Sequence, residues 1–230
     1  MKTIFIYVVI LFSLISYANA INFEIANNDS IYSKSEKYRI SVEPKLHWGF
    51  IIAHSPAILY LVEKHFAMYE CTFNLHTLGN KSWHNDYKKS MWGISYIYSD
   101  LGNKKYLGGL HALITHFTFP LFKNNNTLFA FRLGTGGSWI ERPFNRIENY
   151  KNVAIGSHFN ISMSGIFELR KNINTRTQFT TALCLNHYSN GAAKIPNLGI
   201  NVLSINAGIT YKFKNKNSTI CDSNGSCSKK

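Results

Sequence analysis

Apolar and polar residues alternate along most of the chain beyond residue 37. The clearest example is Asn160–Arg170, where Ile161 and Met163 fall on one side of the backbone and the polar residues fall mostly on the other. Residues 127–136 and 203–213 show the same period of two. A period of two is that of a β-strand with unlike faces, so the pattern predicts an all-β protein.

Eight segments of this kind follow one another, separated by turn-forming clusters rich in Asn and Lys. They are roughly Tyr38–Ile52, Tyr60–Leu78, Lys89–Tyr98, Leu107–Leu121, Thr127–Ile140, Val153–Arg170, Thr175–Ser189 and Ile200–Phe213. Each is long enough for a tilted bilayer crossing, which takes about nine to eleven residues. Regularly spaced strands without helical patterns between them indicate a barrel or a sandwich.

Alternation by itself fits two architectures. In a soluble barrel or sandwich the apolar face points inward, whereas in an outer-membrane barrel it points to lipid. The even strand count and the aromatic residues near strand ends favour the membrane, because such residues gather at its interfaces. Those residues are Trp48, Trp83, Trp92, Trp139 and Tyr211. We predict an eight-stranded antiparallel up-and-down outer-membrane β-barrel, with a soluble exported barrel as the alternative.

The first segment has the form of an export signal. A basic start at Lys2 precedes the apolar run Ile4–Ile15, and Ala18-Asn19-Ala20 fits a small-x-small cleavage site. We therefore expect a signal peptide at 1–20, a polar lead-in at 21–37, the barrel at 38–213 and a polar, Cys-containing tail at 214–230. The expected location is the outer membrane of a Gram-negative bacterium, with the joins 141–152 and 190–199 facing outward.

Composition narrows the partners. Hydrophobic residues make up 45% and charged residues 16%, which excludes a disordered chain. The 25 basic and 12 acidic residues give a net charge of +13, which favours anionic partners such as phosphate-bearing lipid or nucleic acid. The predicted export signal and the strand pattern argue against nucleic acid as the partner. Basic residues of the predicted outer joins either contact lipid phosphates or are merely solvated: Arg142, Arg146, Lys151 and Lys194.

Four cysteines and nine histidines suggest no metal site. Cys221 and Cys227 could close a small disulfide in an oxidising compartment or remain free thiols. Cys71 and Cys184 lie within strand patterns and are expected to be packing residues. Neither CxxC nor HExxH is present, so we expect no metal and no cofactor.

The candidate chemistry lies at the end of the seventh predicted strand. His187 and Ser189 share a face with Leu183 and Leu185, and Asn201 has the matching parity on the next strand. Polar groups facing hydrocarbon are costly without partners, whereas a lipid hydrolase needs a nucleophile and a base at this depth. The alternative is an interfacial Ser/His pair that hydrogen-bonds to nearby backbone.

At these residues the sequence resembles the lipid A 3-O-deacylases and related acyloxyacyl-hydrolase-like proteins. The resemblance rests on His187-x-Ser189-Asn190-Gly191 and Pro196-Asn197-x-Gly199-Ile200. It covers about residues 40–213 and extends more loosely through three further segments: 49–56, 131–136 and 152–157. The resemblance implies an eight-stranded barrel with its site on the outer wall.

The resemblance also implies roles. Ser189 would be the nucleophile and His187 the general base, while Asn201 stands where the family has a glutamate. An amide can orient the imidazole but cannot stabilise its charged form. Candidate oxyanion donors, which could equally be ordinary turn residues, are Asn190, Gly191 and Asn197.

We therefore expect an outer-membrane esterase that removes a fatty acyl chain from lipid A, the lipid part of lipopolysaccharide. The alternative is a non-catalytic structural or lipid-binding barrel that has lost the acidic member of the triad. The sequence leaves open which acyl chain is removed and whether the protein oligomerises.

Overall fold

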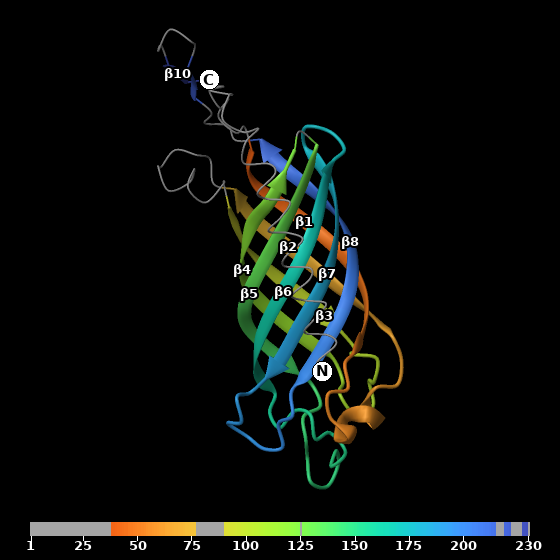
Figure 1. Ribbon diagram of the computed structural model, residues 1–230. Helices are drawn as coiled ribbons and strands as arrows, with labels where there is room; N and C mark the ends of the chain where they lie inside the picture. Colours follow the sequence, from red (N-terminus) through yellow and green to blue (C-terminus); the bar gives the residue numbers. More distant parts are fainter. Residues whose placement is uncertain (1–37, 77–89, 125, 215–218, 222–226, 230) are drawn as a thin grey trace. The chain divides into compact units, whose positions relative to one another are not determined.

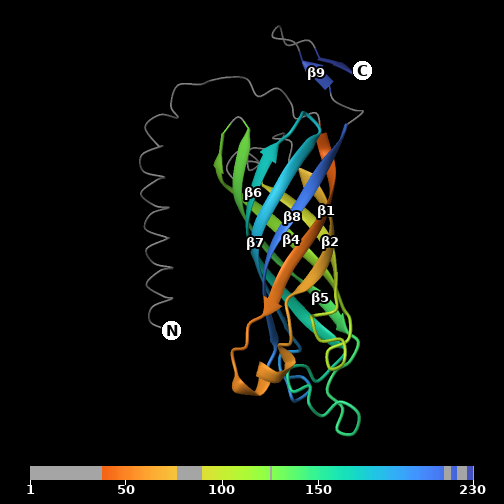
Figure 2. The same ribbon diagram turned by 90° about the vertical axis from the view of Figure 1, so that its right-hand side faces the viewer.

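The computed structural model describes residues 38–76, 90–124, 126–214, 219–221 and 227–229. Eight strands form a closed antiparallel barrel in which each strand pairs with its neighbour in sequence and β8 pairs with β1 (Figures 1 and 2). They are β1 (Tyr38–Ile51), β2 (Phe66–His76), β3 (Met91–Ser99), β4 (Leu110–Lys123), β5 (Thr127–Ile140), β6 (Phe159–Asn172), β7 (Thr177–Ser189) and β8 (Ile200–Lys214). The predicted eight-stranded fold is confirmed.

Two predicted strand starts are wrong. The second strand begins at Phe66 and not at Tyr60, because Pro56–Leu61 forms the 3-10 helix η2. Ser55 caps this helix by accepting a hydrogen bond from the Ala57 amide at 3.3 Å. The sixth strand begins at Phe159 and not at Val153. In both places apolar residues pack over one mouth of the barrel, so their spacing imitates a strand without forming one.

The remaining segments of the chain differ in how far the structure describes them. In the tail, β9 (Thr219–Cys221) and β10 (Cys227–Lys229) pair in a two-stranded sheet that is separate from the barrel sheet. Cys221 lies opposite Cys227 in this pairing, but a disulfide between them concerns side chains outside the described part. The predicted signal peptide, the lead-in and Trp83 also lie outside the described residues. No described helix is both long and apolar enough to cross a bilayer.

Large apolar side chains cover the outside of the barrel. Along β6, Ile161 and Met163 are 57% and 55% exposed, while Ser162 and Ser164 between and after them are buried. Trp48, Trp92, Trp139 and Tyr211 lie on the same outer surface. Soluble proteins rarely expose contiguous apolar areas of this extent, whereas an outer-membrane barrel turns them to lipid. The wall therefore excludes the soluble alternative.

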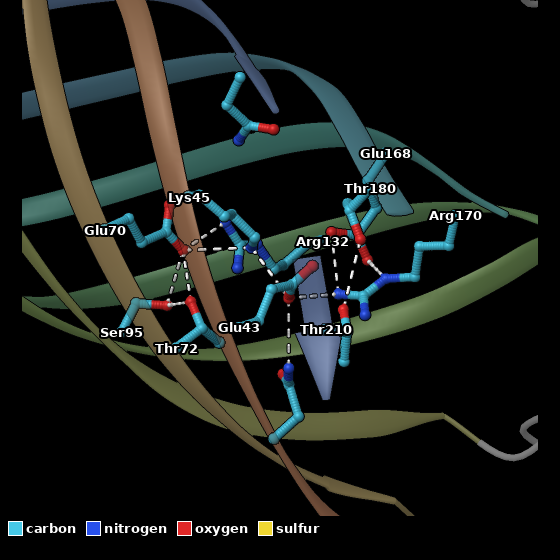
Figure 3. Close-up of polar contacts among 12 residues, drawn as sticks. Glu43, Lys45, Glu70, Thr72, Ser95, Arg132, Glu168, Arg170, Thr180 and Thr210 are labelled. Carbon is cyan, nitrogen blue, oxygen red and sulfur yellow. Dashed lines mark hydrogen bonds and ion pairs between the residues drawn. The ribbon is translucent and has the colours of Figure 1, made fainter. Parts of the chain in front are cut away.

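Buried ion pairs fill the middle of the barrel (Figure 3). Glu70 accepts hydrogen bonds from Arg132 at 2.9 Å and from Lys45 at 3.4 Å. Its further contacts are with His47 at 2.8 Å, Thr72 at 2.6 Å and Ser95 at 3.0 Å. These residues come from four different strands, β1, β2, β3 and β5, so Glu70 ties together distant parts of the wall.

Two further buried carboxylates, Glu43 and Glu168, extend these contacts. Arg170 bridges Glu43 at 3.1 Å and Glu168 at 2.9 Å, and Lys45 lies 3.2 Å from Glu43. Lys45 therefore links the two parts of the network, which we call the lumen network: Glu43, Lys45, His47, Glu70, Arg132, Glu168 and Arg170. Buried charges are tolerated when each is paired and hydrogen-bonded, and three carboxylates here meet three cations.

One mouth of the barrel is closed by an apolar cluster. We call this mouth the outer end; it carries the β1–β2, β3–β4, β5–β6 and β7–β8 joins (Figure 1). The cluster combines strand residues such as Ile140 and Tyr188 with loop residues such as Leu61, Leu107 and Ile155, all buried. Side chains therefore fill the lumen in both regions.

Removing Glu70 should destabilise the barrel strongly. Glu70→Ala leaves Arg132 without its buried ion-pair partner, a change that typically costs about 3–5 kcal/mol. The free energy of unfolding can be measured by urea titration in lipid vesicles, following the gel shift between folded and unfolded barrel. Glu148→Ala, in an exposed part of the β5–β6 loop, is the control. Equal unfolding midpoints for the two variants would contradict the role given to Glu70.

Candidate active site on the outer wall

The end of β7 presents His187 and Ser189 to the outside. Tyr188 between them is fully buried in the apolar cluster. Successive side chains of a strand point to opposite faces, so this tyrosine directs both neighbours outward. Asn201 lies directly opposite His187 in the pairing of β7 with β8. The structure therefore brings together the three residues singled out from the sequence, each of them half-buried.

A chain of hydrogen bonds at this level links β7, β8 and the segment that follows β1. His187 Nδ1 lies 2.7 Å from Asn201 Oδ1, and Asn201 Nδ2 lies 3.0 Å from His54 Nδ1. The Ile52 amide donates to the Asn201 carbonyl at 2.8 Å, which brings the residues after β1 beside the start of β8. The sequence pattern gives His54 no role, because nothing local shows that the end of β1 meets the start of β8.

Two donors meet at the hydroxyl of Ser189. The Asn197 side-chain amide donates to Oγ at 2.8 Å, and the Gly191 backbone amide donates at 3.2 Å. The hydrogen bonds among the described residues include none between Ser189 and His187. The two residues are about 6.6 Å apart along the strand, from a rise of about 3.3 Å per residue. Hydrogen bonds of a catalytic pair are often long without substrate and tighten in the complex.

Asn190 holds the loop rather than the hydroxyl. Its side chain donates to Ser157 Oγ at 2.8 Å and to the Lys194 carbonyl at 2.9 Å, both away from Ser189. Its backbone amide donates to Asn197 Oδ1 at 3.3 Å. This last contact turns the Asn197 amide so that its NH₂ group faces Ser189. Of the three predicted donors, Asn197 and Gly191 donate to Ser189, whereas Asn190 donates to Asn197 and not to Ser189.

The β5–β6 loop supports the β7–β8 loop from below. Asn152 is buried; its side chain donates to the Arg142 carbonyl at 2.7 Å and accepts from the Ile155 amide at 3.2 Å. The Gly199 amide in turn donates to the Ala154 carbonyl at 2.9 Å. The loop that carries Asn197 therefore rests on hydrogen-bonded backbone, which fixes its distance from the end of β7.

The surroundings of the site are apolar toward the barrel middle and aromatic toward the outer end. Ser189 pairs with Ile161 and His187 with Met163 on β6, both exposed. Further out, Trp139 pairs with Phe159 and stacks on His158 with ring centroids 4.6 Å apart. Aromatic side chains collect where headgroups meet acyl chains, so Ser189 lies just inside that boundary.

Basic side chains stand in the outer loops. All four of the predicted phosphate-binding candidates, Arg142, Arg146, Lys151 and Lys194, are exposed. Lys151 lies 5.8 Å from the centre of the Tyr106 ring, which Lys105 also approaches at 5.2 Å. Within the described residues, no group of three or more His, Cys, Asp or Glu side chains could hold a metal ion.

Gly199 packs against the imidazole of His187. Its φ is +78°, and a Cβ at this position would lie 2.9 Å from His187 Cε1. Gly191 also has a positive φ, +64°, but a Cβ there would meet nothing within 4 Å. Both glycines therefore need a left-handed backbone, but only Gly199 restricts the position of the His187 imidazole.

Gly199→Ala should displace His187, whereas Gly191→Ala should not. Both changes cost about 1 kcal/mol because a Cβ disfavours the left-handed backbone. We expect only Gly199→Ala to shift the imidazole resonances of His187, measured by NMR on histidine-labelled protein in detergent micelles. Unchanged resonances in Gly199→Ala would mean that His187 is held elsewhere.

Comparison with known proteins gives one family. Residues 67–210 match the sequence profile of the lipid A 3-O-deacylase (PagL) family, a segment that includes His187, Ser189, Asn197 and Asn201. No curated protein matches the chain.

Several solved structures resemble the barrel. The outer membrane enzyme PagL is 19% identical, with 72% of this chain and 97% of that chain covered and a TM-score of 0.47. Neisserial surface protein A is 10% identical, with 76% and 97% covered and a TM-score of 0.48. The N-terminal β-barrel domain of Pseudomonas aeruginosa OprF is 12% identical, with 74% and 97% covered and a TM-score of 0.41. Since the family profile spans more than half of the sequence, this chain belongs to the lipid A 3-O-deacylase (PagL) family.

Proposed function

We propose that this protein is an outer-membrane esterase that hydrolyses a fatty acyl ester of lipid A, with Ser189 as nucleophile and His187 as general base. One observation supports this most directly: a hydroxyl, an imidazole and two amide donors gather on the lipid-facing wall of a barrel from this family. The family description names the 3-O ester, and we propose the same bond here. The protein would act from the outer membrane of a Gram-negative bacterium.

The hydrogen bonds of Ser189 suit a nucleophile. A serine hydroxyl has two acceptor lone pairs and one hydrogen to donate. Asn197 and Gly191 occupy the acceptor side, so the hydroxyl hydrogen is left for a base. His187 directs Nδ1 to Asn201 and so has Nε2 available to accept this proton. A small rotation of either side chain on substrate binding would complete the contact.

The proposed reaction has two halves. Ser189 Oγ attacks the acyl carbonyl carbon while His187 Nε2 takes its proton, giving a tetrahedral oxyanion. The bond to the sugar oxygen then breaks, that oxygen takes the proton from His187, and the acyl group stays on Ser189. Water, deprotonated by His187, attacks the acyl-serine; the fatty acid leaves and Ser189 regains its proton.

The donors at Ser189 can serve the oxyanion. The Asn197 amide and the Gly191 N–H point at Oγ in the free protein. An acyl carbonyl oxygen entering beside Oγ would take over both bonds as negative charge develops on it. Donors fixed before the reaction stabilise such charge most effectively, and the contact between Asn190 and Asn197 provides that fixing.

The position of the site suits a phosphorylated glycolipid. An acyl ester of lipid A lies between its sugar headgroup and its chains, which is the depth at which Ser189 meets the wall. The exposed Ile161 and Met163 would contact acyl chains, and basic loop residues such as Arg142 and Lys194 would lie on the headgroup side. Attraction to phosphate is consistent with the net charge of +13.

A non-catalytic lipid-binding barrel is the second candidate. It is favoured by the amide of Asn201, which stands where the resemblance to the family implies a glutamate. An amide cannot stabilise the imidazolium by charge, and this exchange can cost about 10⁴ in turnover where it imposes the wrong tautomer. Under this alternative the natural protein would release no fatty acid, and activity that appears in Asn201→Glu would show that the site geometry is intact and only the charge is missing.

Ser189→Ala should abolish deacylation. Purified protein in detergent is incubated with lipopolysaccharide, and lipid A is analysed by mass spectrometry for loss of one acyl chain. We expect Ser189→Ala to reduce the rate by at least about 10³-fold, because the acyl-enzyme cannot form. Thr181→Ala removes another hydroxyl of β7, outside the site, and should leave the rate unchanged. An active Ser189→Ala protein would rule out the proposed nucleophile.

Asn197→Ala should slow the reaction without preventing lipid binding. Loss of one oxyanion donor typically reduces kcat by about 10²–10³-fold, and we expect kcat to fall with little change in KM. Asn124→Ala, which removes an amide from the β4–β5 turn at the opposite end, is the matched control. A purely higher KM would assign Asn197 to substrate binding instead.

A further inference from the structure

His54 lies next to Asn201 although the two are 147 residues apart in sequence. Its ring is exposed and makes two polar contacts. Nε2 lies 2.9 Å from the Leu198 backbone carbonyl, and Nδ1 lies 3.0 Å from Asn201 Nδ2. His54 has no hydrogen bond to Ser189 or His187 among the described contacts, so any effect on them must pass through Asn201.

The Leu198 carbonyl fixes the direction of every bond in the chain. A carbonyl oxygen can only accept, so the neutral His54 ring must carry its hydrogen on Nε2 and present a lone pair at Nδ1. That lone pair requires the NH₂ group of Asn201. Asn201 must then turn Oδ1 toward His187, and His187 must carry its hydrogen on Nδ1. This leaves Nε2 of His187 unprotonated, the state that a general base needs.

We propose that His54 is a positioning residue of this active site: it orients the Asn201 amide and thereby selects the tautomer of His187 that can accept the Ser189 proton. The inference rests on the proposed function for its consequence in catalysis. It assigns His54 no contact with substrate or with the reacting atoms.

An amide needs this orientation and a carboxylate does not. Either oxygen of a glutamate can accept from His187 Nδ1, so rotation of the group changes nothing. Rotating the Asn201 amide by half a turn would present NH₂ to His187 Nδ1 and force its hydrogen onto Nε2. The ring could then no longer take a proton from Ser189. His54 therefore compensates for the exchange of the family glutamate by an amide.

The tautomer of His187 can be measured without any activity. Nitrogen-15 NMR of histidine-labelled protein in detergent micelles separates the two neutral tautomers by the shifts of their ring nitrogens. We expect the Nδ1–H form of His187 in the natural protein and a mixture in His54→Leu. His111→Leu, which removes a half-buried outer-wall histidine that contacts Tyr96 at 2.7 Å, is the control. An unchanged tautomer in His54→Leu would overturn the proposal.

Kinetics give the second test. His54→Leu should lower kcat by about 10- to 100-fold with little change in KM, from the loss of one orienting hydrogen bond. His54→Asn, whose side-chain carbonyl can accept from Asn201 Nδ2, should restore most of the rate. In the Asn201→Glu background, His54→Leu should change kcat less than threefold, the non-additivity expected of residues acting through one another. Equal losses in both backgrounds would overturn the proposal.

The two tests also separate this inference from the proposed function. A natural protein without deacylase activity would refute the esterase, while the NMR measurement would still decide whether His54 sets the tautomer. If His54→Leu does not fold, His54→Asn and the Asn201→Glu pair remain. Full activity in His54→Leu, with His187 still in its Nδ1–H form, would refute the role of His54 alone.

Discussion

The alternation of side chains along each strand, combined with closure of the sheet, governs this protein. In a closed barrel every strand has one side chain row in the lumen and the other toward lipid, and no edge remains to relieve a conflict. Tyr188 shows the consequence on β7: its ring belongs to the buried apolar cluster, so His187 and Ser189 have no direction left except outward. The packing of Tyr188 in the barrel interior therefore places the candidate site on the lipid-facing surface.

The lumen network and the apolar cluster divide the interior between them. Glu70 and Glu43 connect strands on different sides of the barrel, and the cluster closes the outer end beneath the loops. Together they leave a filled cylinder whose wall can act as a fixed platform. A catalytic group gains from such a platform because its geometry is set before the substrate arrives.

At the outer end of the barrel, loops supply the hydrogen-bond donors of the candidate site. Strand β7 carries His187 and Ser189, the proposed base and nucleophile, whereas the hydrogen-bond donors come from the β7–β8 loop, whose Gly199 amide donates to the Ala154 carbonyl. Asn201 lies opposite His187 on β8, and His54, from the segment after β1, contacts the Asn201 amide. The site thus combines three local pieces that only the closed sheet brings into contact.

The sequence alone determined the number of strands and which residues of a strand share a face, including His187 and Ser189 on one strand and Asn201 on the next. It could do so because a period of two is a local property of the chain. It placed the starts of the second and sixth strands wrongly, at Tyr60 and Val153, because apolar residues that cover a barrel mouth have the same spacing as residues in the barrel wall. It could not reveal the lumen network, the support of Asn190 by Ser157, or the contact of His54 with Asn201. The lumen network depends on how distant strands face one another across the barrel, the Ser157 contact on the meeting of two loops, and the His54 contact on the closure of β1 on β8.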